Sequence, residues 1–250
     1  MKKINTIIFD YGGTLDTDAR HWAHVLFEGY RHAQIPVDEP NFRDAYVYGE
    51  RALAKAPIVL PDDDFHTVLL KKVDQETIFL RDNNLWTPSE EERQKNIKAV
   101  ADYCNAYVER NMEVTRRVLS ELNPAYNMVL VSNFYGNIHA ILRQYKIDHF
   151  FSAVIESAVV GVRKPDSAIY QMGVDAAGCS AEEVLVVGDS YGKDMVPAKT
   201  VGCHAVWMRG EGWSKEEVDE TLPDAIIYHL PELLDVLKKA LPTSVFCTGI

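Results

Sequence analysis

Short, strongly apolar runs rich in β-branched residues recur along the chain and constrain its fold more than any other feature. They are residues 4–9, 128–131, 153–155, 184–187, 204–207 and 225–227. Several runs are continuous rather than alternating, which is typical of strands covered on both faces. Because helical patterns separate the later runs, we predict an α/β fold with a doubly wound, mainly parallel sheet.

The helices expected to cover this sheet follow the strands in regular order. Their patterns span residues 136–145, 166–177, 191–201 and 231–241. Pro165 stands near the start of the second helix, a position that suits its fixed φ. Ser180 and Glu183 have the spacing of a capping box, which predicts a short capped segment before the next strand.

The interval of residues 17–111 lacks strand patterns and is rich in helix formers. Phe65, Val68, Leu69 and Val73 fall on one helical face, and Thr87 precedes Pro88 and an acidic run that suits a helix N-terminus. We therefore expect an all-helical cap subdomain at 17–111, inserted into a core domain of residues 1–16 and 112–250. The sheet should resume near Val114, with the cap above the carboxyl ends of the strands, where open α/β sheets bind ligands.

Charge and composition narrow the partners. The 250 residues include 26 basic and 37 acidic side chains, a net charge of -11. This charge disfavours nucleic acid as a partner, and no apolar run approaches membrane-spanning length. Four scattered cysteines favour reduced thiols in a cytoplasmic protein. The apolar tail at residues 241–250 could pack on the core or on another subunit, so monomer and homodimer both stay open.

Acidic side chains follow two of the expected strands directly. Asp10 ends the first strand and precedes Gly12 and Gly13, and Asp189 follows the strand at 184–187, with Asp194 close behind. Paired acids beside a substrate phosphate suit Mg²⁺, which prefers oxygen ligands and retains several waters. Taken alone, each acid could equally be a solvated or capping residue.

Anion-binding groups also follow strands. Ser132 and Asn133 close the second core strand, and Arg163 and Lys164 precede a helix. Hydroxyl and backbone N–H groups at a strand end can hold phosphate oxygens. On their own, these residues are more simply explained as a helix cap and a solvated charge pair.

Together, these residues resemble the four motifs of the haloacid dehalogenase-like hydrolase superfamily. Asp10-Tyr-Gly-Gly-Thr-Leu is similar to the first motif, Ser132 to the second, Lys164-Pro165 to the third, and Gly188-Asp189 with Asp194 to the fourth. The resemblance covers residues 1–16 and 112–240. The position of the insertion is similar to that of the helical cap of many such enzymes.

The resemblance implies a mechanism as well as a fold. Asp10 would attack phosphorus and form an aspartyl-phosphate that water hydrolyses. Mg²⁺ would be held by Asp10, the backbone carbonyl of Gly12, Asp189 and Asp194. The phosphate would be bound by Gly13, Ser132, Asn133 and Lys164, with Ser132 and Lys164 also counted as catalytic residues. The implied substrate is a small phosphorylated metabolite.

Gly12 departs from the family pattern. Most phosphatases of the superfamily carry an Asp at this position, which protonates the leaving group and activates water. General acid–base help of this kind is worth ~10²–10⁴ in rate. Some branches carry Gly here, so loss of activity does not follow. Asp16 and Asp18 lie nearby, but family geometry offers neither as a ready substitute.

Two other functions stay open beside a phosphatase. A catalytically weak or inactive phosphate-binding or regulatory protein would tolerate Gly12, although the intact acids and Lys164 count against it. A haloacid dehalogenase needs neither a leaving-group proton nor a metal. However, that branch carries Tyr two positions after the nucleophile, whereas Tyr11 is one position after Asp10. Arg20, His21, Trp22, His24, Tyr135 and Tyr191 are the residues that could border the pocket, and the sequence does not identify the substrate.

Overall fold

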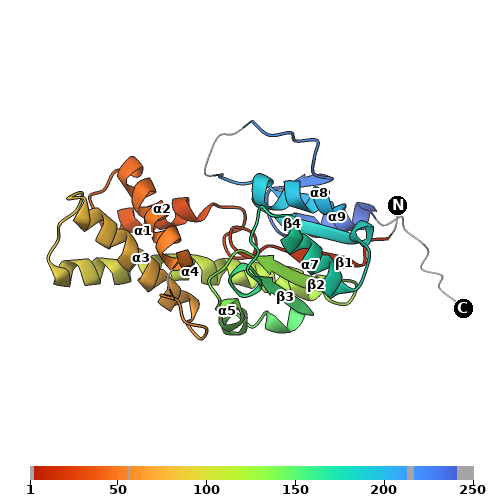
Figure 1. Ribbon diagram of the computed structural model, residues 1–250, viewed down its shortest axis with the longest axis horizontal. Helices are drawn as coiled ribbons and strands as arrows, with labels where there is room; N and C mark the ends of the chain where they lie inside the picture. Colours follow the sequence, from red (N-terminus) through yellow and green to blue (C-terminus); the bar gives the residue numbers. More distant parts are fainter. Residues whose placement is uncertain (1–2, 56, 213–216, 241–250) are drawn as a thin grey trace, which may run out of the picture.

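A parallel sheet forms the centre of the protein in the computed structural model, which describes residues 3–55, 57–212 and 217–240 (Figure 1). The strands are β1 (Thr6–Phe9), β2 (Asn127–Ser132), β3 (Ala153–Glu156), β4 (Val184–Gly188), β5 (His204–Met208) and β6 (Ala225–Ile227). Their order is β3-β2-β1-β4-β5-β6, and all five pairings are parallel. The sequence prediction of an α/β fold with a parallel sheet is confirmed.

Helices cover both faces of the sheet because its strands are apolar on both sides. Ile8 packs on one face with side chains of α7 (Ala168–Ala177) and α8 (Val196–Val201). Ile7 and Phe9 pack on the other face with α5 (Ile138–Gln144), α9 (Glu232–Ala240) and the end of α4 (Glu90–Leu122). Short elements complete the core: η1 (Asp148–Phe150), α6 (Ser157–Val160), η2 (Ala181–Glu183) and η3 (Tyr191–Met195). The capping box predicted at Ser180 and Glu183 is present.

A helical lobe extends from the carboxyl end of β1 (Figure 1). It contains α1 (Trp22–His32), α2 (Glu39–Lys55), α3 (Phe65–Asp82) and the first part of α4. Tyr30, Phe42, Val73 and Val100 are among its buried apolar side chains. We call this lobe the cap.

Helix α4 differs from the sequence prediction at both of its ends. The chain does not re-enter the sheet near Val114, because α4 continues without a break to Leu122 and the next strand begins at Asn127. Cap side chains cover α4 at Val100 and core side chains cover it at Leu119, so one apolar stripe serves both parts. The helix is capped by Ser89, which accepts from the Glu92 N–H at 3.2 Å, and not by Thr87.

The remaining sequence expectations concern the tail, the cysteines and membranes. The apolar tail at 241–250, including Cys247, lies outside the described residues. Cys104, Cys179 and Cys203 are free thiols. Within the described ranges, the helices are too short or too polar for a membrane span.

Candidate active site

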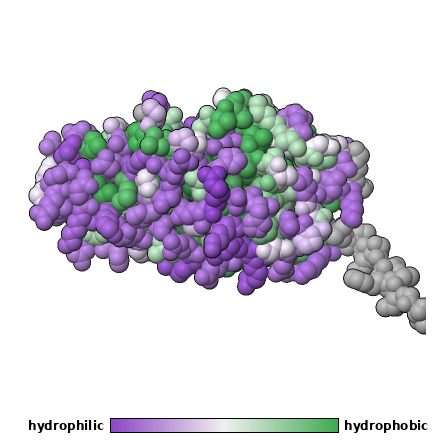
Figure 2. Space-filling model, turned by 90° about the horizontal axis from the view of Figure 1, so that it is seen from below, coloured by the Kyte–Doolittle hydropathy of each residue, from purple (hydrophilic) through white to green (hydrophobic). Residues whose placement is uncertain are grey.

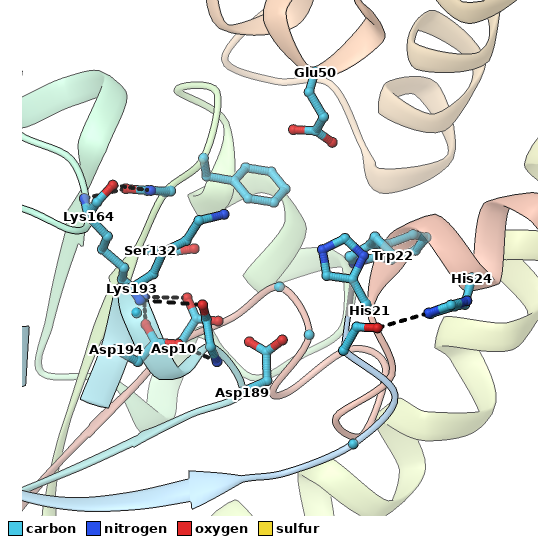
Figure 3. Close-up of a pocket in the computed structure, with 18 of the residues that line it drawn as sticks. Asp10, His21, Trp22, His24, Glu50, Ser132, Lys164, Asp189, Lys193 and Asp194 are labelled. Atoms are coloured by element: carbon cyan, nitrogen blue, oxygen red, sulfur yellow. Dashed lines mark hydrogen bonds and ion pairs between the residues drawn. The ribbon is translucent and has the colours of Figure 1, made fainter. Parts of the chain in front are cut away.

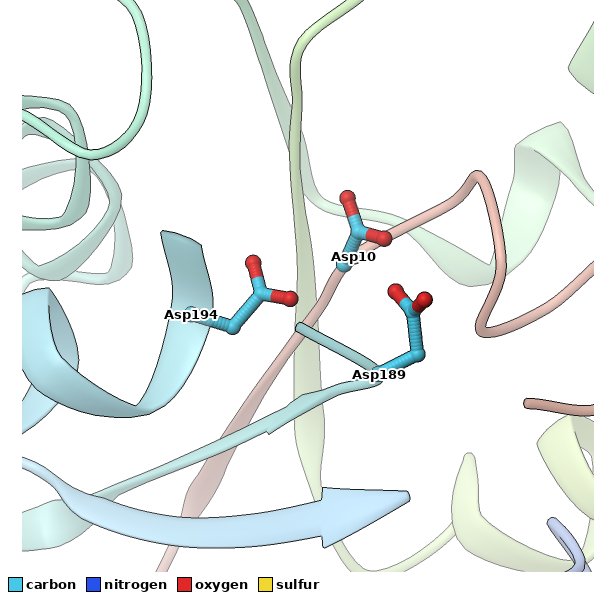
Figure 4. Close-up of side chains that lie close together, drawn as sticks. All are labelled: Asp10, Asp189 and Asp194. Carbon is cyan, nitrogen blue, oxygen red and sulfur yellow. The ribbon is translucent and has the colours of Figure 1, made fainter. Parts of the chain in front are cut away.

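Three carboxylates meet at the carboxyl end of the sheet. Asp10 directly follows β1, Asp189 directly follows β4, and Asp194 lies in the single π-turn η3. Each offers an oxygen, and these oxygens lie within 4.8 Å of one another (Figure 4). Parallel strands end at one edge of a sheet, so residues 179 positions apart in the chain become neighbours. The structure thus brings the predicted acids together.

Two glycines make this convergence possible. A Cβ on Gly13, whose φ is +97°, would lie 2.3 Å from Asp189 Oδ2. A Cβ on Gly188 would lie 2.5 Å from Asp194 Cγ. Both positions exclude any larger residue unless the carboxylates move. Gly13, predicted to bind phosphate, donates its N–H to Asp16 Oδ1 at 2.7 Å.

Lys164 joins two of the acids. Its Nζ donates to Asp10 Oδ1 at 2.6 Å and to Asp194 Oδ1 at 2.7 Å, and its side chain is 2% exposed (Figure 3). Asp194 Oδ1 also accepts from the Tyr170 hydroxyl at 2.7 Å, and Oδ2 accepts from the Ser190 N–H at 2.9 Å. Burial by itself would lower the pKa of Lys164, but Asp10 and Asp194 raise it above its usual value. Lys164 is therefore a fixed cation.

One lysine does not neutralise three acids. Burial raises the pKa of Asp10 to about 6, against the lowering effect of Lys164. Burial raises the pKa of Asp189 well above its usual value, and the charges of Asp10 and Asp194 raise it further. Clustered carboxylates in a poorly hydrated place resist ionisation unless a cation joins them. The acid cluster thus has the composition of a cation site.

Ser132 ends β2 and Asn133 follows it, at the same edge of the sheet as the acids. The Ser132 side chain lines the cavity, and its Oγ is buried without a hydrogen-bond partner among the described residues. A buried hydroxyl is costly without a partner, so this atom suits an oxygen of a bound ligand. Asn133 instead holds the backbone of Lys164: its Oδ1 accepts from the Lys164 N–H at 2.9 Å, and its Nδ2 donates to the Lys164 carbonyl at 3.1 Å.

Gly12 lines the cavity and leaves room beside it. A Cβ placed on Gly12 would meet no atom within 4 Å. The nearby acids have other partners. Asp16 is buried, its Oδ2 accepts from Trp22 Nε1 at 2.9 Å, and burial raises its pKa to about 7. Asp18 accepts from the Leu230 N–H at 2.9 Å. Neither carboxyl takes the place of an acid at Gly12.

A cavity of about 980 Å³ separates the acids from the cap. Of the residues predicted to border it, His21, Trp22, His24, Tyr135 and Tyr191 line it. Arg20 does not, because it pairs with Glu28 at 2.7 Å.

Sequence reasoning missed three polar residues here. Tyr170 reaches Asp194 from α7, while Glu50 and Lys72 line the cavity from the cap. Each lies on a helix whose polar positions look like ordinary surface positions. No motif spacing distinguished them from solvated residues.

Known proteins with related sequences identify the family of this chain. The profile of the haloacid dehalogenase-like hydrolase family matches residues 4–202. Glyceraldehyde 3-phosphate phosphatase from Pyrococcus furiosus is 33% identical over 95 residues, which are 38% of this chain and 40% of that protein. The chain therefore matches well under two thirds of this curated relative.

Solved structures of low sequence identity share the fold. The HAD-hydrolase YfnB from Bacillus subtilis, solved bound to magnesium, has a TM-score of 0.58 at 20% identity and covers 94% of this chain and 99% of its own. A dehalogenase solved with an intermediate complex has a TM-score of 0.62 at 17% identity, over 94% and 98% of the two chains. These similarities support the fold alone. With the family profile spanning both ends of the acid cluster, the chain belongs to the haloacid dehalogenase-like hydrolases.

Proposed function

We propose that this hydrolase is a magnesium-dependent phosphatase of a small phosphorylated metabolite, with Asp10 as its nucleophile. The observation that carries the proposal is the arrangement of three carboxylates around one buried lysine, in a cavity also lined by Ser132, whose hydroxyl has no partner among the described residues. An excess of acids suits a cation, and the hydroxyl and lysine suit phosphoryl oxygens. The phosphatase relative supports the same reaction class.

The acid cluster fits a divalent cation. Asp10, Asp189 and Asp194 would hold it, together with the backbone carbonyl of Gly12. All four donors are hard oxygens, as Mg²⁺ prefers. When bound, the cation would neutralise the acids and withdraw charge from the phosphoryl group.

The side chains then divide the chemistry. An Asp10 carboxylate oxygen attacks phosphorus, the bond to the substrate oxygen breaks, and an aspartyl-phosphate forms. Lys164 holds Asp10 in place and, with Ser132, stabilises the phosphoryl oxygens. Water then attacks phosphorus, which releases inorganic phosphate and restores the Asp10 carboxylate.

Glycine at position 12 should slow this reaction, because it cannot act as a general acid. Among the described residues, Gly12 offers no carboxyl and neither Asp16 nor Asp18 takes its place, so the leaving-group proton would come from water or from the substrate. We expect slow turnover of poor leaving groups and faster turnover of acyl phosphates. The same absence favours a second candidate function, a regulatory protein that binds phosphate without turnover.

Phosphate release separates the candidates. The wild type and Asp10→Asn are compared on acetyl phosphate and a panel of phosphorylated metabolites, with magnesium or with EDTA. Asp235→Asn, an exposed change on α9, serves as the matched control. Turnover that requires both magnesium and Asp10 supports the phosphatase. Turnover of 2-haloacids without metal would favour a dehalogenase, and phosphate binding without turnover would favour the regulatory role.

A further inference from the structure

An acid–base pair faces the active site from the cap. Glu50 of α2 points into the cavity from the side opposite the acids (Figure 3). Its Oε1 accepts from Lys72 Nζ of α3, and its Oε2 accepts from the Tyr135 hydroxyl at 3.0 Å. Tyr135 belongs to the core loop that follows β2 and Ser132, so this contact joins the cap to the core. Lys72 also lies 4.4 Å from the centre of the Tyr46 ring.

Exposure separates the roles of the two partners. The Lys72 side chain is 7% exposed, whereas that of Glu50 is 36% exposed. Burial alone would raise the pKa of Glu50, but Lys72 and Tyr135 lower it below its usual value. Glu50 is therefore an ionised carboxylate with lone pairs available to the cavity. The more deeply buried Lys72 neutralises its charge.

The described part of the cap wall carries no excess charge. Its charged lining residues are two acids and two cations: Glu50 pairs with Lys72, and Glu39 pairs with Arg43 at 3.1 Å. The imidazole of His21 is neutral at neutral pH, because burial, helped by nearby lysines, lowers its pKa to about 4. Three further lining cations belong to the core: Arg163 and Lys193, next to Lys164 and Asp194 in sequence, and Arg209, which pairs with Glu220 at 2.5 Å.

Apolar side chains complete the cap wall. Trp22 and Phe65 line it with ring centres 5.4 Å apart, beside Val68 and Leu69. The wall thus offers an apolar surface next to a hydrogen-bond acceptor. Such a surface suits a leaving group with C–H faces and hydroxyls.

We infer that the substrate is a sugar or polyol phosphate whose uncharged, hydroxylated leaving group donates hydrogen bonds to Glu50. This assignment rests on the proposed phosphatase activity. A leaving group bearing a carboxylate would approach Glu50 at a wall whose cations are already paired, and like charges at close range are costly. Lys72 acts through Glu50 as a positioning residue, and Tyr135 holds Glu50 against the core.

Two ligands that differ in one group test the inference by binding. Glycerol 3-phosphate and 3-phosphoglycerate share their phosphate and differ in a hydroxymethyl against a carboxylate. Titration calorimetry with the Asp10→Asn protein and magnesium measures both affinities without turnover. We expect glycerol 3-phosphate to bind about tenfold more tightly, with ribose 5-phosphate at least as tight.

Glu50→Gln should invert this preference, because it removes the carboxylate and leaves Lys72 without its partner charge. We expect glycerol 3-phosphate to weaken about fivefold and 3-phosphoglycerate to strengthen by a similar factor. Glu91→Gln, an exposed change on α4 of the cap, should alter neither affinity. A purely structural role for Glu50 would weaken both ligands equally.

Two results would overturn the inference. One is that the Asp10→Asn protein with Glu50 intact binds 3-phosphoglycerate more tightly than glycerol 3-phosphate. The other is that Glu50→Gln weakens the binding of both ligands equally. Inorganic phosphate is titrated in parallel as a probe of the core. Failure of inorganic phosphate to bind would count against the proposed function. Normal phosphate binding without discrimination between the two esters would count against the cap assignment alone.

Discussion

Two acid clusters face each other across the cavity, and each has a buried lysine. In the core, Lys164 donates hydrogen bonds to Asp10 and Asp194, and Asp189 lies beside them. In the cap, Lys72 forms an ion pair with Glu50. The core cluster has three acids for one cation, whereas the cap pair is matched.

A second acid in the cap sharpens the contrast. Glu76 lies behind the pair, fully buried, and its Oε2 accepts from the Tyr30 hydroxyl at 2.9 Å. Burial raises its pKa to about 7 against the lowering effect of Lys72, so it takes a proton readily. Burial raises the pKa of acids in both clusters, but only the three core carboxylates lie close enough together, among the described residues, to share a metal ion. Three carboxylates with one lysine make the core suitable for a cation. One cavity-facing carboxylate with its own lysine makes the cap suitable for a neutral group.

Removing each lysine in turn should give the largest difference. Lys164→Met leaves buried carboxylates without their cation and should lower the free energy of unfolding by about 3–5 kcal/mol in EDTA. Magnesium should restore part of this loss. Lys72→Met should cost about 1–2 kcal/mol, because the partly exposed Glu50 can hydrate and Glu76 can protonate. Urea unfolding with magnesium and with EDTA measures the free energy of unfolding of both variants. If magnesium restored the stability of Lys72→Met, the contrast between the core and cap clusters would be wrong.

Adding an acid to the core should raise activity. Gly12→Asp introduces a side chain where a Cβ meets no atom within 4 Å, so the fold should tolerate it. We expect kcat for a poor leaving group to rise about 10–100-fold, with less effect on acetyl phosphate, because the new carboxyl can protonate the leaving oxygen.

The neighbouring glycine supplies the control. Gly13→Ala places a Cβ 2.3 Å from Asp189 Oδ2 and should reduce both magnesium binding and turnover. An unchanged or lower kcat for Gly12→Asp on poor leaving groups, in a stable protein, would show that this position does not limit the reaction.

The buried Glu76 should give the cap a pH-dependent stability. Its pKa of about 7 lies above the usual value of 4.5, so the folded state holds a proton that the unfolded state releases. The contribution is fully present below about pH 4.5 and is lost as pH rises to about 7. Glu76→Gln should therefore be more stable than the wild type at pH 8 by about 2 kcal/mol and close to it at pH 4.5. Thermal unfolding with magnesium across this range measures the slope, and an unchanged slope would refute the assignment.

The smallest effect is expected from a hydrogen bond to the core acids. Tyr170→Phe removes a donor at 2.7 Å from Asp194, which keeps Lys164 and the Ser190 N–H. We expect a loss of about 1 kcal/mol in unfolding free energy. Tyr228→Phe, with a side chain at the surface, should cost nothing measurable. A loss as large as that of Lys164→Met would mean that Tyr170 holds the cluster together.

Motif residues and cap residues differ in how far the sequence predicts them. Asp10 and Asp189 follow strands, Ser132 ends one and Lys164 precedes a helix, so strand order places them at one edge of the sheet. The boundary of the core was harder to predict, because α4 continues one apolar stripe from the cap to Leu122 without a break in its pattern. The sequence does not predict Glu50, Lys72 and Tyr170, because tertiary packing, not spacing along the chain, turns Glu50 and Lys72 toward the cavity and Tyr170 toward Asp194.

Magnesium binding tests the contrast between the two clusters most directly. Calorimetric titration of Mg²⁺ is made into the wild type, Asp189→Asn and Glu50→Gln at neutral pH. We expect one site in the wild type, a loss of at least about tenfold in affinity for Asp189→Asn, and no change for Glu50→Gln, since the three clustered carboxylates lie in the core. Equal binding by the wild type and Asp189→Asn, or weakened binding in Glu50→Gln alone, would contradict the placement of the cation in the core.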